Sequence, residues 1–333
     1  MNILCATDFL PKSEAAIERS AFLADLLTAE LALVHAVAPS TPDGHTLEER
    51  LQNARSRLVR RANPPEWRWK SAPEIAVQFG RPSRVVLDQA HRRGSRLVVV
   101  GPHRNSRIPD AASGTITEKV LVAATCPLLI AQQQMRGPYR EVLVALDDTP
   151  HSADVVRAVE ALHLTDERPA TVIHAHEPPH AAMMSTIGGA TAADTYVATS
   201  RAQAHAGIRD LLQLHSCDAD RYRIMVIDRR PASAILEAIQ RVQPDLVVLG
   251  ARARGRFSRA LLGSVASAVA SAAQCDVLLV PDRSAGARRV LPQKTLRNQT
   301  TPSGAAATGR SRTGLPHYLA GKPPDMLPER TES

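Results

Sequence analysis

The chain has 333 residues, enough for two domains that each bury a core, and a formal net charge of +8. Its four cysteines are dispersed and form no Cys-x-x-Cys pair, which argues against a zinc site or a disulfide framework. No uncharged apolar run approaches the roughly 18 residues that cross a membrane, and the N-terminus lacks the pattern of a signal peptide. We therefore expect a soluble, cytoplasmic protein with no membrane partner.

The positive charge is concentrated at the C-terminal end. Residues 284–333 contain eight Lys and Arg against three Asp and Glu, which leaves a net charge of +3 for residues 1–283. The same segment has six prolines, five glycines and little apolar periodicity, so it cannot bury enough surface to fold. We expect a disordered, basic C-terminal tail, and we regard a tail that binds nucleic acid or anionic lipid as the weaker alternative.

Short apolar runs alternate with helix-like stretches along residues 1–135. Strands are predicted at Ile3–Thr7, Glu30–Ala36, Ile75–Phe79, Leu97–Val100 and Leu128–Ala131. Helices are predicted between them at Ser13–Leu27, Thr46–Arg61, Ser83–Arg92 and Gly114–Ala124. This order, with strands rich in Val, Ile and Leu, indicates the α/β class: a mostly parallel sheet with helices on both faces.

Residues 139–283 repeat the same order. Their strands are predicted at Val142–Leu146, Ala170–Ala175, Ile224–Ile227, Leu246–Leu249 and Val277–Val280. The connection Met135–Tyr139 is too short for a flexible linker. We therefore expect the two domains to pack closely, side by side.

Matching landmarks indicate that the two halves are copies of one domain. Asp8 and His35 recur 139 residues later as Asp147 and His174, whereas later landmarks recur after 149 residues. The later pairs are Pro82 with Pro231, Gly101 with Gly250, Gly114 with Gly263, and Cys126 with Cys275. An ordered series with a single insertion indicates a duplication. The ten extra residues are placed around Ala181–Ala193, where Met183, Met184, Gly188 and Gly189 predict a loop or a mobile helix entry.

Candidate ligand-binding residues follow the first and fourth strands of each copy. Ligands of open parallel sheets sit beyond the carboxyl ends of the strands, where Asp8, Asp147, Gly101 and Gly250 are expected. The loops after the two glycines lead to helix starts at Gly114-Thr115 and Gly263-Ser264. Glycine allows close backbone approach to a phosphate, and a helix N-terminus offers free N–H groups. With an Asp that can hold a ribose hydroxyl or a metal, this pattern describes a nucleotide site.

The second copy resembles a known family in this region. Gly250-Ala-Arg-Ala253, nine residues and Gly263-Ser264 are similar to the universal stress protein signature, G-x-x-G followed by nine residues and G-[S/T]. Ile3–Asp8 and Val142–Asp147 resemble the first strand of the family, and the likeness covers residues 1–135 and 139–283. It implies two tandem five-stranded domains of strand order 3-2-1-4-5, of the adenine-nucleotide α-hydrolase-like type, and a role in stress tolerance. One branch of this family binds ATP through the signature and another does not.

Departures from the signature favour the second copy as the nucleotide site. There Ala253 replaces the second glycine, a change of one methyl group, whereas in the first copy Arg104 replaces it and Asp110 would bring negative charge near a phosphate. We predict a degenerate loop in the first copy and a site for ATP, with magnesium, in the second. Its residues are Asp147, Gly250, Arg252, Ala253, Arg254, Gly255, Gly263 and Ser264. The alternative is that both loops only shape a turn and pack the domains.

Other reactive side chains receive structural interpretations. His35 and His174 are expected to pack at strand ends rather than to contact a ligand, and Cys126 and Cys275 to be buried. No metal cluster appears at ligand spacing, and Asp147 and Asp148 do not form an acid/base pair by spacing alone.

Three functions remain open. The first is a stress-response binding protein that is not an enzyme beyond slow ATP hydrolysis. The second is a tandem scaffold that binds no nucleotide and acts through protein partners. The third is an enzyme of the nucleotidyl transferase type. The chain is expected to be a pseudo-dimer of its two copies, present as a monomer or a homodimer.

Overall fold

The computed structural model describes residues 1–39, 44–63, 70–102, 120, 125–178, 181–252 and 263–282. All of them belong to one compact unit, Met1–Val290. The predicted tail at 284–333 and the predicted helix Gly114–Ala124, except Val120, lie outside the described residues. In the part that is described, no helix is both long enough and apolar enough to span a bilayer.

The first half follows the predicted order of elements closely. Its strands are β1 (Asn2–Ala6), β2 (Glu30–Val37), β3 (Glu74–Phe79), β4 (Leu97–Val100) and β5 (Leu128–Ile130). Its helices are the 3-10 turn η1 (Pro11–Ser13), α1 (Glu14–Leu26), α2 (Leu47–Ala62) and α3 (Pro82–Arg92). Local signals fix the helix starts: Thr46 and Glu49 form a capping box at α2, and Pro82 occupies the first position of α3.

The second half repeats the strands and adds a long helix. Its strands are β6 (Val142–Ala145), β7 (Ala170–Ala175), β8 (Tyr222–Ile227), β9 (Leu246–Ala251) and β10 (Asp276–Pro281). Its helices are α5 (His151–Ala161), α6 (Ala181–His215), the 3-10 turn η2 (Ala219–Arg221), α7 (Pro231–Val242) and α8 (Ser264–Ala272).

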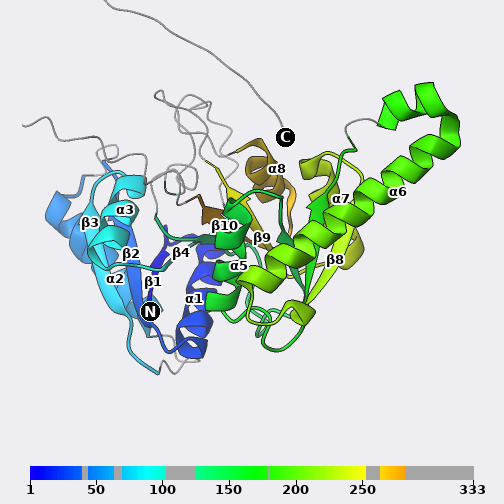
Figure 1. Cartoon of the computed structure of the whole chain (residues 1–333). Helices are drawn as coiled ribbons and strands as arrows, with labels where there is room; N and C mark the ends of the chain where they lie inside the picture. The colour runs from blue at the N-terminus through cyan, green and yellow to red at the C-terminus, as the bar shows by residue number, and fades with distance from the viewer. Residues whose placement is uncertain are drawn as a thin grey trace, which may run out of the picture. The chain divides into compact units, whose positions relative to one another are not determined.

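All ten strands form one sheet in the order β3-β2-β1-β4-β5-β10-β9-β6-β7-β8 (Figure 1). Within each half every pair is parallel and the strand order is 3-2-1-4-5, which confirms the expected fold. The halves meet through the antiparallel pair β5–β10, where Leu129 lies opposite Leu278. The last strand of each copy therefore satisfies the sheet edge of the other.

Helices cover both faces of this sheet. Alternate strand residues point to opposite faces, so Ile3 and Cys5 pack against α1 and α2, whereas Leu4 packs in the layer of α3. In the second half, α5 and α6 share the core of the first face, and α7 and α8 share that of the second. Burial on both faces is the physical reason that the strands read as continuous apolar runs.

The insertion in the second copy is helical, so of the two alternatives predicted around Ala181–Ala193, a loop or a mobile helix entry, the loop is wrong and a helix begins there. The whole stretch belongs to α6, which is interrupted at Gly189, where φ is 74° and ψ is −176°. Figure 1 shows the first turns of α6 set at an angle to the rest of the helix. Ala and Met are good helix formers, so the sequence on either side of the glycine is helical while the glycine supplies the break.

Asp276, the first residue of β10, joins the second half to the first. Its Oδ2 lies 3.3 Å from Nε of Arg19, on α1, and accepts a hydrogen bond of 2.7 Å from the hydroxyl of Tyr139. Its Oδ1 accepts bonds from the backbone N–H groups of Gln132 and Gln133, at 2.8 and 3.2 Å. Asp276 is 1% exposed and Arg19 4% exposed, so this is a buried ion pair. It fixes the short connection between the copies against both of them.

Candidate functional site

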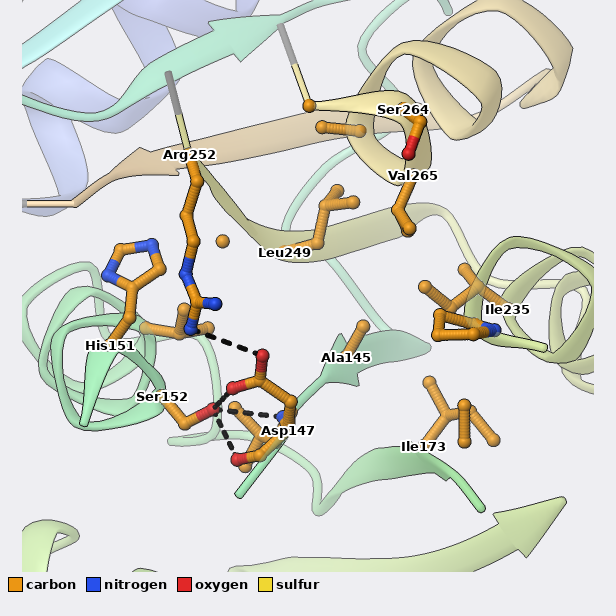
Figure 2. A pocket seen from close by; sticks show the side chains of 17 residues that line it. Ala145, Asp147, His151, Ser152, Ile173, Ile235, Leu249, Arg252, Ser264 and Val265 are labelled. Carbon is orange, nitrogen blue, oxygen red and sulfur yellow. Dashed lines mark hydrogen bonds and ion pairs between the residues drawn. The ribbon is translucent and has the colours of Figure 1, made fainter. Parts of the chain in front are cut away.

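A cavity of about 270 Å³ lies at the carboxyl ends of β6 and β9. It is in the second copy, where the nucleotide site was predicted. Figure 2 shows polar side chains gathered on one side, namely Asp147, Ser152, His151 and Arg252. The remaining wall is apolar and contains Ala145, Ile173, Ala175, Ile235 and Leu249. One wall can therefore pack an uncharged ring while the other binds polar groups.

Asp147 follows β6 by two residues and is held by its own loop. Its Oδ1 accepts bonds from the backbone N–H of Thr149 at 3.2 Å and from the Ser152 hydroxyl at 2.9 Å. Burial raises the pKa of Asp147, but the hydrogen bonds from Thr149 and Ser152 and the charge of Arg252 outweigh it, so the net effect is a lowered pKa. The group is therefore a carboxylate at neutral pH.

Arg252 follows β9 and lies across the polar side of the cavity. Its Nη2 is 3.3 Å from Oδ2 of Asp147 and also donates a hydrogen bond to Thr149. Its Nε is 3.9 Å from Oδ2 of Asp282, at the end of β10. The Arg252 guanidinium is partly exposed, so an anion that enters the cavity can reach it. The guanidinium would then pair with that anion in place of the Asp147 carboxylate.

The start of α8 forms another wall. Gly263 is the N-cap residue and Ser264 the first helical residue, and no side chain caps this end. The first N–H groups of a helix have no partner inside the helix, and the helix dipole adds partial positive charge there. Gly263 and Ser264 both line the cavity, so this helix start lies at its wall.

Gly250 also lines the cavity, and the structure shows a further reason for a glycine there. A Cβ at this position would lie 2.6 Å from Cδ2 and 2.7 Å from Nε2 of His151. The glycine therefore makes room for the His151 ring, whereas the sequence suggested close approach to a phosphate. Of the predicted site residues, Asp147, Gly250, Arg252, Gly263 and Ser264 line one cavity. Ala253, Arg254 and Gly255 lie outside the described residues.

The two strand-end histidines hold the backbone. Nδ1 of His35 is 2.8 Å from the carbonyl oxygen of Thr7, and Nδ1 of His174 is 3.0 Å from that of Leu146. Because a carbonyl only accepts, each ring donates from Nδ1. His174 is not among the residues that line the cavity, in agreement with the packing interpretation.

The first copy retains part of this arrangement. Asp8 accepts a bond from Ser13, just as Asp147 does from Ser152, 139 residues later. Gly101 packs against the start of α1, since a Cβ there would lie 3.1 Å from the carbonyl oxygen of Lys12. The residues on which its predicted degeneracy depends, Arg104, Asp110, Gly114 and Thr115, lie outside the described part of the chain.

Sequence reasoning missed His151 and the carboxylates around it. His151 and Asp154 begin α5, and Asp282 follows β10, so the three come together only in the fold. The signal that could have drawn attention to His151 is its position four residues after Asp147, in the segment that follows the first strand of the second copy. The sequence had predicted no metal cluster, yet these residues place one possible ligand atom each within 4.8 Å of one another.

The model of the universal stress protein family matches residues 1–132 and again residues 138–281. This chain belongs to the universal stress protein family. The double match confirms the tandem organisation, and the cavity lies within the second matched region. The resemblance expected from Gly250 to Ser264 is thereby confirmed at the level of the family.

Relatives of this universal stress protein align with it over nearly their whole length. One from Mycolicibacterium smegmatis is 26% identical over 301 residues, covering 85% of this chain and 97% of the relative. One from Mycobacterium tuberculosis is 26% identical over 306 residues, covering 84% and 96%. Both are described as universal stress proteins.

Solved structures support the same fold. A universal stress protein from Archaeoglobus fulgidus aligns with a TM-score of 0.60 and 17% identity, covering 84% of this chain and 98% of that one. A putative universal stress protein from Pseudomonas aeruginosa aligns with a TM-score of 0.55 and 16% identity, covering 86% and 95%. At these identities the likeness establishes the fold alone.

Proposed function

We propose that the second domain of this universal stress protein binds an adenine nucleotide, ATP carried with magnesium, as part of a stress response. The observation that supports this most is that an uncapped helix N-terminus, a cation and a carboxylate line one cavity with an apolar wall. Each chemical part of a nucleotide has a suitable partner there. The start of α8 and Arg252 suit phosphates, Asp147 suits a ribose hydroxyl, and the wall of Ile173, Ile235 and Leu249 suits a base.

Binding would require Arg252 to change partners. In this structure it pairs with Asp147 and Thr149, so the cavity holds its own cation against its own carboxylate. A phosphate group beside α8 would compete for the guanidinium and release Asp147 for a hydroxyl donor. Arg252 and Asp147 would thus bind each other in the absence of ligand, and a phosphate and a hydroxyl, respectively, in its presence.

We propose a binding protein rather than an enzyme, with at most slow hydrolysis of ATP. Asp147 is engaged by Thr149, Ser152 and Arg252, and its lowered pKa makes it a poor general base. Because the β5–β10 pair already joins the two copies, we also propose that the chain is a pseudo-dimer that needs no second chain. Light scattering of the purified protein would show whether it is a monomer or a homodimer.

Calorimetric titration of ATP with magnesium into the full chain tests the proposal, beside a Gly263→Asp variant. Aspartate is a good N-cap residue, so the variant should keep α8 folded while it places a carboxylate where a phosphate would bind. We expect one site per chain in the wild type and affinity at least about tenfold weaker, or 1.4 kcal/mol, in the variant. A stoichiometry of two would contradict the predicted degeneracy of the first copy.

Gly207→Asp is the matched control. It adds the same charge on α6, at an exposed glycine where a Cβ would meet nothing within 4 Å and which does not line the cavity. It should bind like the wild type. If neither calorimetry nor extraction of the purified protein detects a nucleotide, the tandem scaffold that acts through protein partners becomes the better interpretation.

A further inference from the structure

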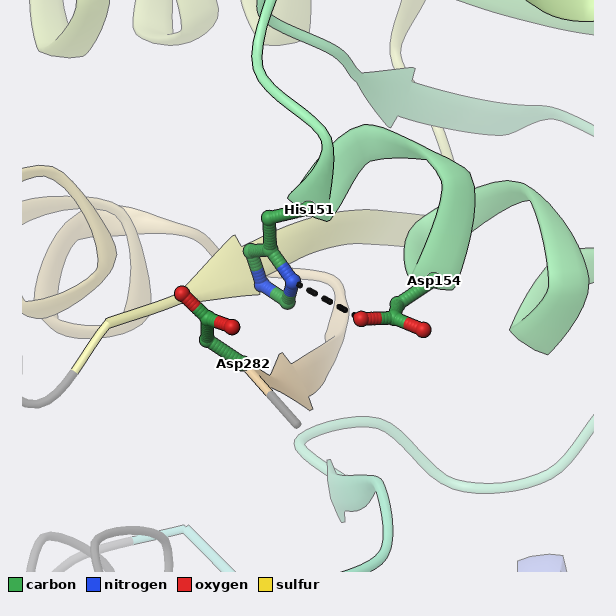
Figure 3. Close-up of side chains that lie close together, drawn as sticks. All are labelled: His151, Asp154 and Asp282. Atoms are coloured by element: carbon green, nitrogen blue, oxygen red, sulfur yellow. Dashed lines mark hydrogen bonds and ion pairs between the residues drawn. The ribbon is translucent and has the colours of Figure 1, made fainter. Parts of the chain in front are cut away.

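His151, Asp154 and Asp282 form a compact group beside the cavity (Figure 3). Each offers one possible ligand atom, and these atoms lie within 4.8 Å of one another. In the described part of the chain no other set of three His, Cys, Asp or Glu side chains does so. The ring belongs to α5, as does Asp154, while Asp282 extends from the end of β10.

The hydrogen bond at one end of the His151 ring determines what the other end can do. Nε2 is 3.0 Å from the carbonyl oxygen of Val280, and since a carbonyl only accepts, Nε2 carries a proton. Nδ1 faces Oδ2 of Asp154 at 3.5 Å, which is longer than an ordinary N–H···O bond. Nδ1 and this carboxylate oxygen therefore face one another at a separation that a direct hydrogen bond does not account for.

This is the pattern of a metal-binding histidine. Such a ring usually donates its second N–H to a carbonyl or carboxylate, which fixes the tautomer and orients the free nitrogen toward the ion. Two ligands on one tetrahedral zinc ion lie roughly 3.4 Å apart, because each bond is about 2.0–2.2 Å. The separation of Nδ1 and Oδ2 matches that spacing. The Asp282 carboxylate, within 4.8 Å of both other groups, is the third possible ligand.

The first copy shows that the fold itself does not need this group. With the offsets of 139 and 149 residues, His151, Asp154 and Asp282 correspond to Lys12, Ala15 and Gln133. Lys12, Ala15 and Gln133 do not together form a metal-binding set. A purely structural role common to the fold would be expected in both copies, so the group is a particular property of the second.

We propose that His151, Asp154 and Asp282 bind one divalent transition-metal ion, with zinc the best match. Magnesium and calcium prefer oxygen ligands, so the imidazole argues against them. Zinc binds imidazole nitrogen and carboxylate oxygen together. Each carboxylate also contacts a guanidinium: Arg157 donates to Oδ1 of Asp154 at 2.6 Å, and Nε of Arg252 lies 3.9 Å from Oδ2 of Asp282. They orient the carboxylates but oppose a dication, so we expect micromolar rather than nanomolar affinity.

Zinc titration of the full chain tests this inference without any nucleotide. Protein freed of metal with a chelator is dialysed and titrated with zinc against a chromophoric competitor, and cobalt is added in parallel to record its visible spectrum. We expect one site per chain, and at least tenfold weaker binding in Asp154→Ala and Asp282→Gln. Both variants carry the residue that the first copy has at the same place, so the fold should accept them.

Asp166→Ala is the matched control, since Asp166 also pairs with a histidine three residues away, His163, at 2.7 Å but in no group of three. It should bind zinc like the wild type. Equal affinity in the wild type and both variants, or no zinc binding at all, would overturn the proposal. Because ATP is absent from the experiment, either result is separate from the test of nucleotide binding.

Discussion

Replacing Asp276 by alanine should weaken the junction between the two copies more than a typical substitution does. The change removes the partner of the buried Arg19 and the acceptor for Tyr139 and two backbone N–H groups. Breaking a buried ion pair from one side costs about 3–5 kcal/mol, and each buried donor left without a partner costs about 1–3 kcal/mol. The ion-pair cost already includes part of the cost of the unpaired donors, so the two figures cannot simply be added.

Part of the loss is offset by contacts that Arg19 keeps. Its Nη1 still donates to the carbonyl of Gly137 at 2.8 Å, and its guanidinium lies 4.0 Å from the centre of the Tyr139 ring. We therefore expect the free energy of unfolding to fall by about 4 kcal/mol in Asp276→Ala. Asp276→Asn keeps an acceptor oxygen and should lose about half as much, about 2 kcal/mol.

Urea unfolding followed by circular dichroism measures both losses, and the Arg19→Met background identifies their source. With the buried cation gone, Asp276→Ala should cost about 2 kcal/mol less than in the wild type, because residues in direct contact couple. A loss below about 1 kcal/mol in the wild type, or the same loss in both backgrounds, would refute the conclusion that this buried ion pair fixes the connection between the copies.

Two further predictions concern His151 and His35. Gly250→Ala should destabilise the protein by about 1–3 kcal/mol in thermal unfolding, because the new methyl group displaces the His151 ring. Most of that loss should vanish in the His151→Ala background, and an equal loss there would contradict the packing explanation. Burial lowers the pKa of His35 from its ordinary value of 6.5 more than its hydrogen bond to Thr7 raises it. Just below pH 6.5, His35 is therefore protonated more often in the unfolded chain than in the folded one. The free energy of unfolding should therefore fall as pH drops from 6.5 toward the folded-state pKa, and urea titrations at several pH values should show a flatter profile for His35→Gln; identical profiles would exclude this histidine as the source.

Most of the fold could be predicted from the sequence because its signals are local. The strand Leu97–Val100 was predicted with the same bounds that it has in the structure, since a fully buried parallel strand is apolar at every position. At Ala181–Ala193 the prediction left a loop and a mobile helix entry open, because two glycines lie there, and the loop alternative was wrong. Helix propensity of the surrounding alanines and methionines outweighed that signal, and only Gly189 leaves the helical conformation.

The candidate site could be predicted in part. Asp147, Gly263 and Ser264 were found because strand ends and helix starts have sequence signals, and the fold brings them to one cavity. The contact of Gly250 with His151 was missed, since nothing in the sequence near the glycine reveals the ring. Asp282 was missed because it is 128 residues from Asp154, and pattern spacing carries no information over that distance.

By itself, the sequence of this universal stress protein determined the duplication, the α/β layers and the edge of the sheet where a ligand would bind. Each follows from periodicity or from repeated landmarks, which are properties of neighbouring residues and of regular offsets. Only the tertiary structure decided the β5–β10 pair, the partners of Asp276, and the meeting of His151 with Gly250, Asp154 and Asp282. Those contacts join segments far apart in the chain, and their geometry is set by how the sheet brings strand ends together rather than by any local preference.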